Sequence, residues 1–172
     1  NSAISGNSSG NGGGIYINNG TLNIANSTIS NNSNGGISSN YSSTVVVNNS
    51  TISNNFSMGF GGGILNDDSS TLTITKSTID ANEVQFDGGG VFNLGALTIT
   101  NSTFSNNSAA AGGGIYNNDT LTVTNSTFSG NSSGIGGGIF NYSTGIVTVN
   151  NSTIYGNSGE GIYNVGATVT LN

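Results

Sequence analysis

The sequence repeats with a period of about 25 residues along its whole length, and this repeat constrains the fold more than any other feature. Each unit contains Asn-Ser-Thr, or a close variant, followed by an isoleucine or phenylalanine that we call the anchor residue. Successive anchors are 25, 23, 27, 25, 24 and 26 residues apart. Such a period with strand-like chemistry is typical of a solenoid, because one unit cannot bury its apolar side alone. The anchors are Ile4, Ile29, Ile52, Ile79, Phe104, Phe128 and Ile154.

Two further apolar patterns follow each anchor. A glycine cluster leads into a pair of apolar residues, the first aliphatic and the second usually aromatic, and then comes an apolar-polar-apolar pattern that we call the LxI motif. Adjacent residues of a strand point to opposite faces, so period-two alternation predicts short strands with four inward apolar ladders. The second members of the pairs then form an exposed outward stripe, predicted as a partner surface: Tyr16, Leu65, Phe92, Tyr116, Phe140 and Tyr163.

An asparagine stands three residues after the anchor in all seven units. Equivalent residues of stacked coils lie about 4.8 Å apart, so identical amides can hydrogen-bond in a ladder. Asparagine also tolerates the left-handed backbone of a sharp corner, and we expect corners at this asparagine and at that of Asn-Ser-Thr. The predicted structural ladder is Asn7, Asn32, Asn55, Asn82, Asn107, Asn131 and Asn157.

These patterns predict an all-β fold, a parallel β-helix (β-solenoid) of seven coils with three short strands each. The repeat is unbroken, so residues 1–172 are expected to form a single domain without evident caps. Joining the last residues to the first restores the repeat in phase, which predicts either a piece of a longer array or a subunit that stacks head to tail. Glycine and β-branched residues at this density disfavour helices. Glycines in the clusters are expected to permit unusual backbone conformations and close approach between coils.

Charge is scarce. Only 5% of residues are charged, and one basic residue, Lys76, stands against seven acidic ones. This balance disfavours a nucleic-acid partner and a basic membrane-binding face. No apolar run is long enough for a membrane span, so we expect no membrane insertion.

Two short motifs, GGG followed by an aliphatic residue and FxxN, resemble the repeat of a known protein family. FxxN stands as Phe104 to Asn107 and Phe128 to Asn131, isoleucine replaces phenylalanine in the other five units, and the glycine motif reads GGGI or GGGV. The repeat resembles that of the bacterial right-handed β-helix proteins of the chlamydial polymorphic outer-membrane protein type, whose units carry GGA, an aliphatic residue and FxxN. This resemblance implies a right-handed coil on a secreted or surface-exposed protein.

Side chains for catalysis are few. Histidine, cysteine and arginine are absent, which excludes nucleophilic triads and most general bases, and Lys76 is expected to be a surface residue. We therefore predict no enzymatic activity, no catalytic residues and no cofactor. Oxygen ligands make Asp80, Glu83 and Asp87 a weak calcium candidate, although the repeated calcium signature GGxGxD is missing.

Threonines flank the LxI motifs of the third to fifth units and point outward. Regular TxT arrays on flat β-helix faces resemble the surfaces of some ice-binding proteins, and Thr73, Thr75, Thr98, Thr100, Thr122 and Thr124 form such an array. The other units interrupt it.

Three functions follow as hypotheses. The first is a non-enzymatic extracellular or cell-surface structural and adhesive β-helix, either a head-to-tail filament subunit or a segment of a long surface stalk. Its partners would be further copies of itself, head to tail or laterally, and glycans or cell-surface ligands. The alternative is a carbohydrate-active enzyme or a glycan-binding β-helix, and the third is an ice-binding protein.

Overall fold

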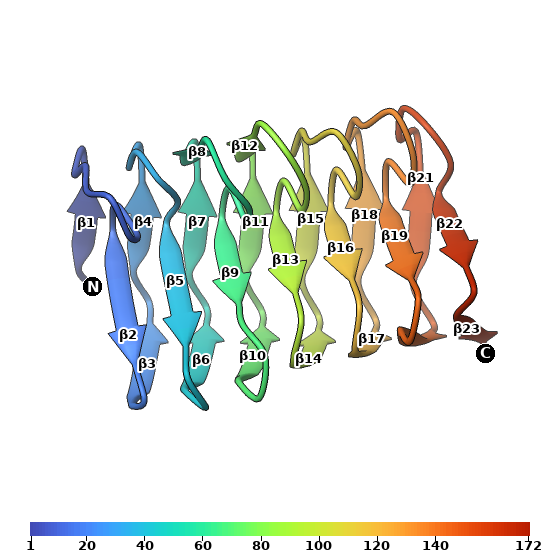
Figure 1. Cartoon of the computed structure of the whole chain (residues 1–172), viewed down its shortest axis with the longest axis horizontal. Coiled ribbons are helices and arrows are strands. Elements are labelled where there is room, and N and C mark those ends of the chain that lie inside the picture. The colour runs from blue at the N-terminus through green and yellow to red at the C-terminus, as the bar shows by residue number, and fades with distance from the viewer.

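The computed structural model describes all 172 residues, which form a parallel β-helix of seven stacked coils (Figure 1). The two termini lie at opposite ends of the stack. Each coil contributes one strand to each of three sheets, and every strand pairs in parallel with its equivalents in the neighbouring coils. The predicted all-β solenoid with three strands per coil is therefore confirmed.

Each sheet contains seven strands. The anchor sheet consists of β1 (Ala3–Ser5), β4 (Thr28–Ser30), β7 (Thr51–Ser53), β11 (Thr78–Asp80), β15 (Thr103–Ser105), β18 (Thr127–Ser129) and β21 (Thr153–Tyr155). The glycine-led sheet consists of β2 (Ile15–Asn18), β5 (Ile37–Asn40), β9 (Ile64–Asn66), β13 (Val91–Asn93), β16 (Ile115–Asn117), β19 (Ile139–Tyr142) and β22 (Ile162–Val165). The LxI sheet consists of β3 (Thr21–Ala25), β6 (Thr44–Asn48), β10 (Thr71–Thr75), β14 (Ala96–Thr100), β17 (Thr120–Thr124), β20 (Ile146–Asn150) and β23 (Thr168–Leu171).

Coils three and four carry one additional pair of strands. β8 (Phe56–Ser57) and β12 (Glu83–Val84) form a two-stranded parallel sheet in the segment between the anchor sheet and the glycine-led sheet. The short pairing fixes the backbone of this segment, which is longest in coils three and four, with 12 residues from the anchor to the glycine-led strand.

The core is the interior of the helix. All but one of its 21 buried hydrophobic residues belong to coils two to six, where the four predicted positions of every coil are filled; the exception is Ile24 of coil one. The other core positions of the two end coils are only partly buried, and Leu171 is 67% exposed, because a neighbouring coil covers them on one side only. The four inward ladders are confirmed. At roughly 1.5–3 kcal/mol for each buried aliphatic side chain, they supply the main stabilisation.

The corner at Asn-Ser-Thr is confirmed as left-handed. Its first residue has a φ between 46° and 52° in coils two to seven, and Lys76 adopts this conformation in place of asparagine. The second corner differs from the prediction. The left-handed residue there directly precedes the ladder asparagine, as Asn106 (φ 54°) precedes Asn107. The residue that precedes the ladder asparagine therefore adopts the left-handed conformation, and the buried asparagine does not.

The glycine clusters are structural, as predicted. Gly112 has a φ of 64°, and a Cβ on it would lie 2.5 Å from the carbonyl oxygen of Ile115. A Cβ on Gly113 would lie 2.6 Å from the carbonyl oxygen of Ser132 in the next coil. The cluster thus combines a turn that L-residues rarely adopt with close contact between coils.

Candidate functional site

The predicted asparagine ladder exists and lies inside the coil. Each side-chain Nδ2 donates to Oδ1 of its equivalent in the next coil, over six links of 2.9–3.0 Å. From coil two onward, Nδ2 also donates to the carbonyl oxygen of the anchor residue in the preceding coil, as Asn107 does to Ile79 at 3.0 Å. Because these amides are fully used, they hold adjacent coils together and are not free to bind a ligand.

A second asparagine ladder was missed by the sequence reasoning. It runs through the interior from coil three to coil seven, with Nδ2 to Oδ1 distances of 2.7–2.9 Å. The available signal was an asparagine directly after the apolar pair in these five coils. Coils one and two carry Ile17 and Ser39 there, and the Ser39 hydroxyl and Asn66 Oδ1 are buried without a partner. The members are Asn66, Asn93, Asn117, Asn141 and Asn164.

Serine forms a third ladder at the Asn-Ser-Thr corner. The backbone N–H of Ser102 donates to Oγ of Ser126 at 3.1 Å, and its own hydroxyl donates to the carbonyl oxygen of Thr100 at 2.9 Å. The same backbone-to-hydroxyl link joins successive serines in every pair of adjacent coils. The most regular polar residues of the sequence thus satisfy the backbone and leave no reactive group exposed.

The acidic residues of the calcium candidate have separate surroundings. Asp80 Oδ1 accepts hydrogen bonds from the Ser105 hydroxyl and from Asn106 Nδ2, and Glu83 is exposed on β12. Burial raises the pKa of the Asp87 carboxyl, against the opposing effect of a hydrogen bond from the Ala111 backbone. The molecule contains no group of three or more His, Cys, Asp or Glu side chains that could hold a metal ion. The structure therefore does not assemble the weak calcium candidate.

The surroundings of two other groups explain why their pKa values are shifted. A hydrogen bond from the Gly136 N–H lowers the pKa of Glu160, which closes the weaker glycine cluster of coil seven. Burial raises the pKa of the Tyr116 hydroxyl, and the charge of Asp87 raises it further. Lys76 is exposed at its corner, as predicted.

The outward stripe is a stack of aromatic rings on the glycine-led sheet. Ring centroids lie 4.8 Å apart for Phe92 and Tyr116, 5.2 Å for Tyr116 and Phe140, and 5.6 Å for Phe140 and Tyr163. The prediction that the whole stripe is exposed was wrong. Phe92 and Phe140 are only 7% and 6% exposed, because their neighbours in the stack and the side chains of Phe60 and Tyr142 cover them.

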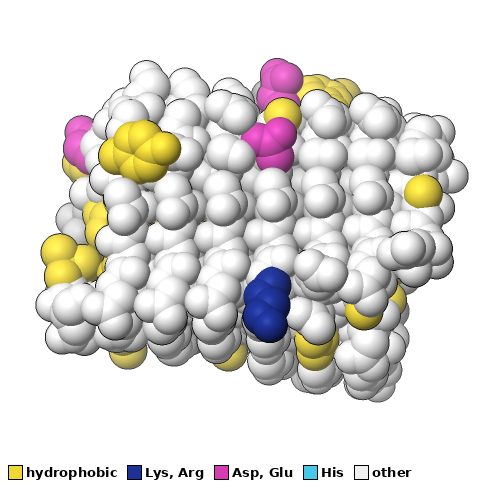
Figure 2. All heavy atoms as spheres, turned by 180° about the vertical axis from the view of Figure 1, so that it is seen from behind, with side chains coloured by type: hydrophobic (Ala, Val, Ile, Leu, Met, Phe, Trp, Pro, Cys, Tyr) yellow, Lys and Arg dark blue, Asp and Glu magenta, His cyan; other side chains and the backbone are white.

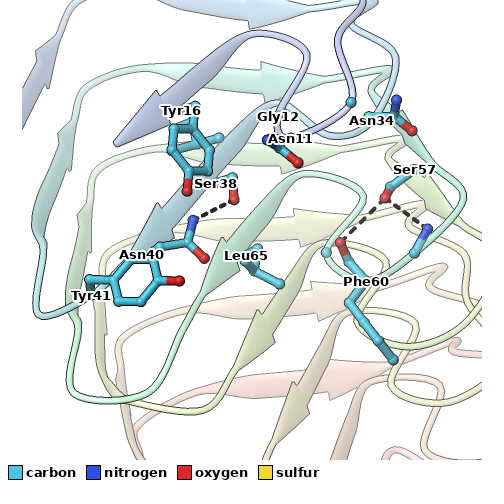
Figure 3. Close-up of a pocket in the computed structure, with 14 residues that line it drawn as sticks. Asn11, Gly12, Tyr16, Asn34, Ser38, Asn40, Tyr41, Ser57, Phe60 and Leu65 are labelled. Carbon is cyan, nitrogen blue, oxygen red and sulfur yellow. Dashed lines mark hydrogen bonds between the residues drawn. The ribbon is translucent and has the colours of Figure 1, made fainter. Parts of the chain in front are cut away.

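The stack is interrupted at coil two. Ser38 replaces the aromatic residue there, and its register partners in coils one and three are Tyr16 and Leu65. The missing ring leaves a groove of about 440 Å³ between these coils (Figure 3). Tyr16, Asn40 and Tyr41 lie on one side of the groove and Ser57 and Phe60 on the other, and Asn11 and Asn34 also line it (Figure 3). No charged residue lines this groove.

The LxI sheet presents a column of threonines. Thr73, Thr98, Thr122, Thr148 and Thr170 are register partners in five successive coils, so the first of the two predicted columns continues for two more coils. The second column, Thr75, Thr100 and Thr124, ends at Asn150 of coil six. The face opposite the glycine-led strands carries mostly uncharged polar atoms, with the single basic residue, Lys76, near its middle (Figure 2). By their register, the six predicted threonines lie side by side on the LxI sheet.

Both ends of the helix leave apolar ladder positions uncovered. One hollow at the first coil is lined by Ile4, Ile15 and Leu22, and one at the last coil by Ile154, Ile162 and Leu171. In coil seven, Asn157 Nδ2 donates to the carbonyl oxygen of Phe128 but has no ladder acceptor beyond it. A further coil would meet the same apolar and polar pattern that joins the coils inside the molecule.

Comparison with known proteins identifies one match. The family model described as a right-handed β-helix region matches residues 13–172. Neither the comparison with curated proteins nor that with solved structures found a match. None of the chain's elements is a helix that is long and apolar enough to cross a membrane.

Proposed function

We propose that this chain, which belongs to the right-handed β-helix family, is a non-enzymatic structural and adhesive module of an extracellular surface. The family establishes the fold, and the fold alone does not establish an activity. The observation that carries the proposal is the continuity of the first asparagine ladder and of the serine links, which run from coil one to coil seven and leave groups to pair at both ends. The closer assignment to the chlamydial type stays a prediction, as does the extracellular location.

Such a module acts as a stiff rod. Each coil is joined to the next by three parallel ladders of backbone hydrogen bonds, the serine links and one or two asparagine ladders. Unpaired strand edges and uncovered apolar residues at the ends favour addition of another coil. In a preparation of this 172-residue chain, the coil that continues the stack is supplied by a second copy.

We expect purified chain to form filaments one solenoid wide in electron micrographs, and Leu171→Asp to prevent them. A carboxylate at this uncovered core position would have to be buried at the junction, which is costly without a partner. The matched control is Ile146→Asp, because Ile146 is also exposed but points outward from the LxI sheet. Short monodisperse rods from the unaltered chain at all concentrations would contradict the filament form of the proposal.

A second candidate function, ice binding, is favoured by the in-register threonine column. Its hydroxyls repeat at the spacing between coils, about 4.8 Å, on a nearly uncharged face. We expect thermal hysteresis in the unaltered chain, and its loss when Thr98 and Thr122 are both replaced by tyrosine, because the rings would disrupt the regular surface. Thr44→Tyr is the control, since its strand carries Val46 and Asn48 instead of the array. Hysteresis that survives the double replacement would argue against this function.

A further inference from the structure

The groove at coil two differs from the rest of the molecule in composition. Elsewhere along the glycine-led sheet the outward position holds a ring or leucine, whereas Ser38 leaves room above the sheet. Its volume of about 440 Å³ falls within the range of roughly 300–1,000 Å³ typical of small-ligand sites. The groove is therefore a candidate ligand site that arises from a departure from the repeat.

Aromatic rings at the groove remain exposed. Tyr16 is 45% exposed and Tyr41 65%, in contrast to the covered Phe92 and Phe140. Figure 3 shows the Tyr16 hydroxyl directed toward the side of the groove on which Asn40 and Tyr41 lie. Rigid rings with a polar tip combine a flat apolar surface with a hydrogen-bonding group. A ligand with one apolar face and many hydroxyls, such as a pyranose, matches this combination.

The backbone at Tyr41 is unusual. Tyr41 has a φ of 53° and Ser42 a φ of 57°, and these residues form the turn between β5 and β6. All other non-glycine residues with positive φ are Asn, Ser, Ala or Lys, so Tyr41 is the one aromatic residue in this conformation. A bulky residue there is a conformational outlier, for which asparagine or glycine would be more favourable. Packing does not account for the tyrosine, because its side chain is mostly exposed.

Polar groups in the groove are open to a partner. Asn40 Nδ2 donates to the Ser38 hydroxyl at 2.8 Å, which leaves Asn40 Oδ1 and the hydroxyl proton of Ser38 available. Asn11 makes its hydrogen bond through the backbone N–H, which donates to Ser9 Oγ, so the side-chain amide of Asn11 is also available. These amides and hydroxyls both donate and accept, as sugar hydroxyls do.

The surrounding charge selects against an anion. The groove contains no cation, and the chain has a net charge of −6. Tyr41 also borders a second hollow of about 630 Å³ that contains Asp67 and Asp68. A uronic acid or sulfated sugar would approach these carboxylates without a basic residue to pair with. A neutral sugar avoids this repulsion, and its hydroxyls can donate to the carboxylates.

We propose that the groove between coils one and three binds a neutral oligosaccharide, with Tyr16 and Tyr41 as stacking surfaces and Asn11, Ser38 and Asn40 as hydrogen-bonding groups. The second hollow extends the site past Tyr41. This inference rests on the proposed adhesive function and names its partner. The filament test does not depend on the groove, so failure of sugar binding and failure of rod assembly can be told apart.

The experiment measures binding of the full chain to neutral tetrasaccharides, namely β-1,4-glucan, β-1,3-glucan and β-mannan, by isothermal titration and by NMR of the sugar protons. Oligogalacturonate is the acidic comparator. We expect at least one neutral sugar to bind and the acidic one to bind at least tenfold more weakly. Binding of none of the neutral sugars, or preference for oligogalacturonate, would overturn the proposal.

Two variants assign binding to the groove. Tyr41→Asn should weaken binding about 2- to 10-fold while thermal stability stays equal or rises, because asparagine suits the left-handed turn and the lost contact is one aromatic surface. Ser38→Tyr should fill the gap with the ring found at this position in other coils, and should abolish binding while the chain stays folded. The control Tyr155→Ser removes an exposed tyrosine from the anchor sheet and should leave binding unchanged. Undiminished binding by Ser38→Tyr would place the sugar elsewhere and overturn the assignment.

Discussion

Asn107→Ala is expected to destabilise the chain by about 3–6 kcal/mol, a large part of the total stability of an ordinary domain. The side chain of Asn107 is fully buried. Its Oδ1 accepts from the backbone N–H and from Nδ2 of Asn82, both at 3.0 Å, and its Nδ2 donates to Asn131 Oδ1 and to the carbonyl oxygen of Ile79. Alanine would leave these partners buried with fewer hydrogen bonds, and each unsatisfied group costs roughly 1–3 kcal/mol.

Urea denaturation followed by circular dichroism measures the change. Asn101→Gly is the matched control, because Asn101 lies in the same coil, is exposed and has a φ of 52° that glycine adopts readily. We expect the control to change the free energy of unfolding by less than about 0.5 kcal/mol. Equal effects of the two substitutions would mean that asparagine recurs here for its corner conformation and not for the ladder.

The sequence predicts the scaffold well because the same physical requirement is met in every coil. A residue such as Ile79 or Phe104 has a register partner of the same kind above and below it, so inward positions repeat and can be identified by their phase. The conformation of single corners is less predictable. Asn106 and Asn107 are both asparagines, and only their surroundings decide which one turns the chain and which one is buried.

The candidate site was harder to predict because it depends on departures from the repeat. In the sequence, Ser38 of coil two breaks the series of apolar pairs, but the consequence of this break depends on Tyr16, Tyr41 and Phe60, which lie in three different coils. Periodicity says nothing about such residues in variable corners. The same limit explains why the exposure of the outward stripe was predicted wrongly. The alternation places Phe92 on the outward face, but only the structure shows that the ring of Phe60 covers it, with the two ring centroids 4.6 Å apart.

The three calcium candidates show a second way in which sequence reasoning fails on this fold. Asp80, Glu83 and Asp87 are close in sequence, and this proximity suggested a shared site. In a β-helix the nearest neighbours of a residue lie one coil away, not a few residues along the chain. Asp80 accordingly pairs with Ser105 and Asn106 of the next coil, and Asp87 lies near Tyr116. Sites on this fold are better sought by comparing equivalent positions of successive coils.

Gly113→Ala tests the contact between coils at its closest point, and we expect a loss of about 3 kcal/mol or more. The added Cβ would lie 2.6 Å from the Ser132 carbonyl oxygen and 2.7 Å from that of Gly137, and neither can move without displacing the next coil. Coil six would have to separate from coil five, which would stretch the hydrogen bond from Gly114 N–H to the Gly137 carbonyl. Gly10→Ala is the matched control, since nothing lies within 4 Å of its added Cβ and its φ is not positive. It should be neutral or stabilise by about 0.4–1 kcal/mol, because alanine restricts the unfolded chain. If thermal and urea unfolding show both variants to be equally stable, the coils are not in the close contact that the glycine cluster is proposed to permit.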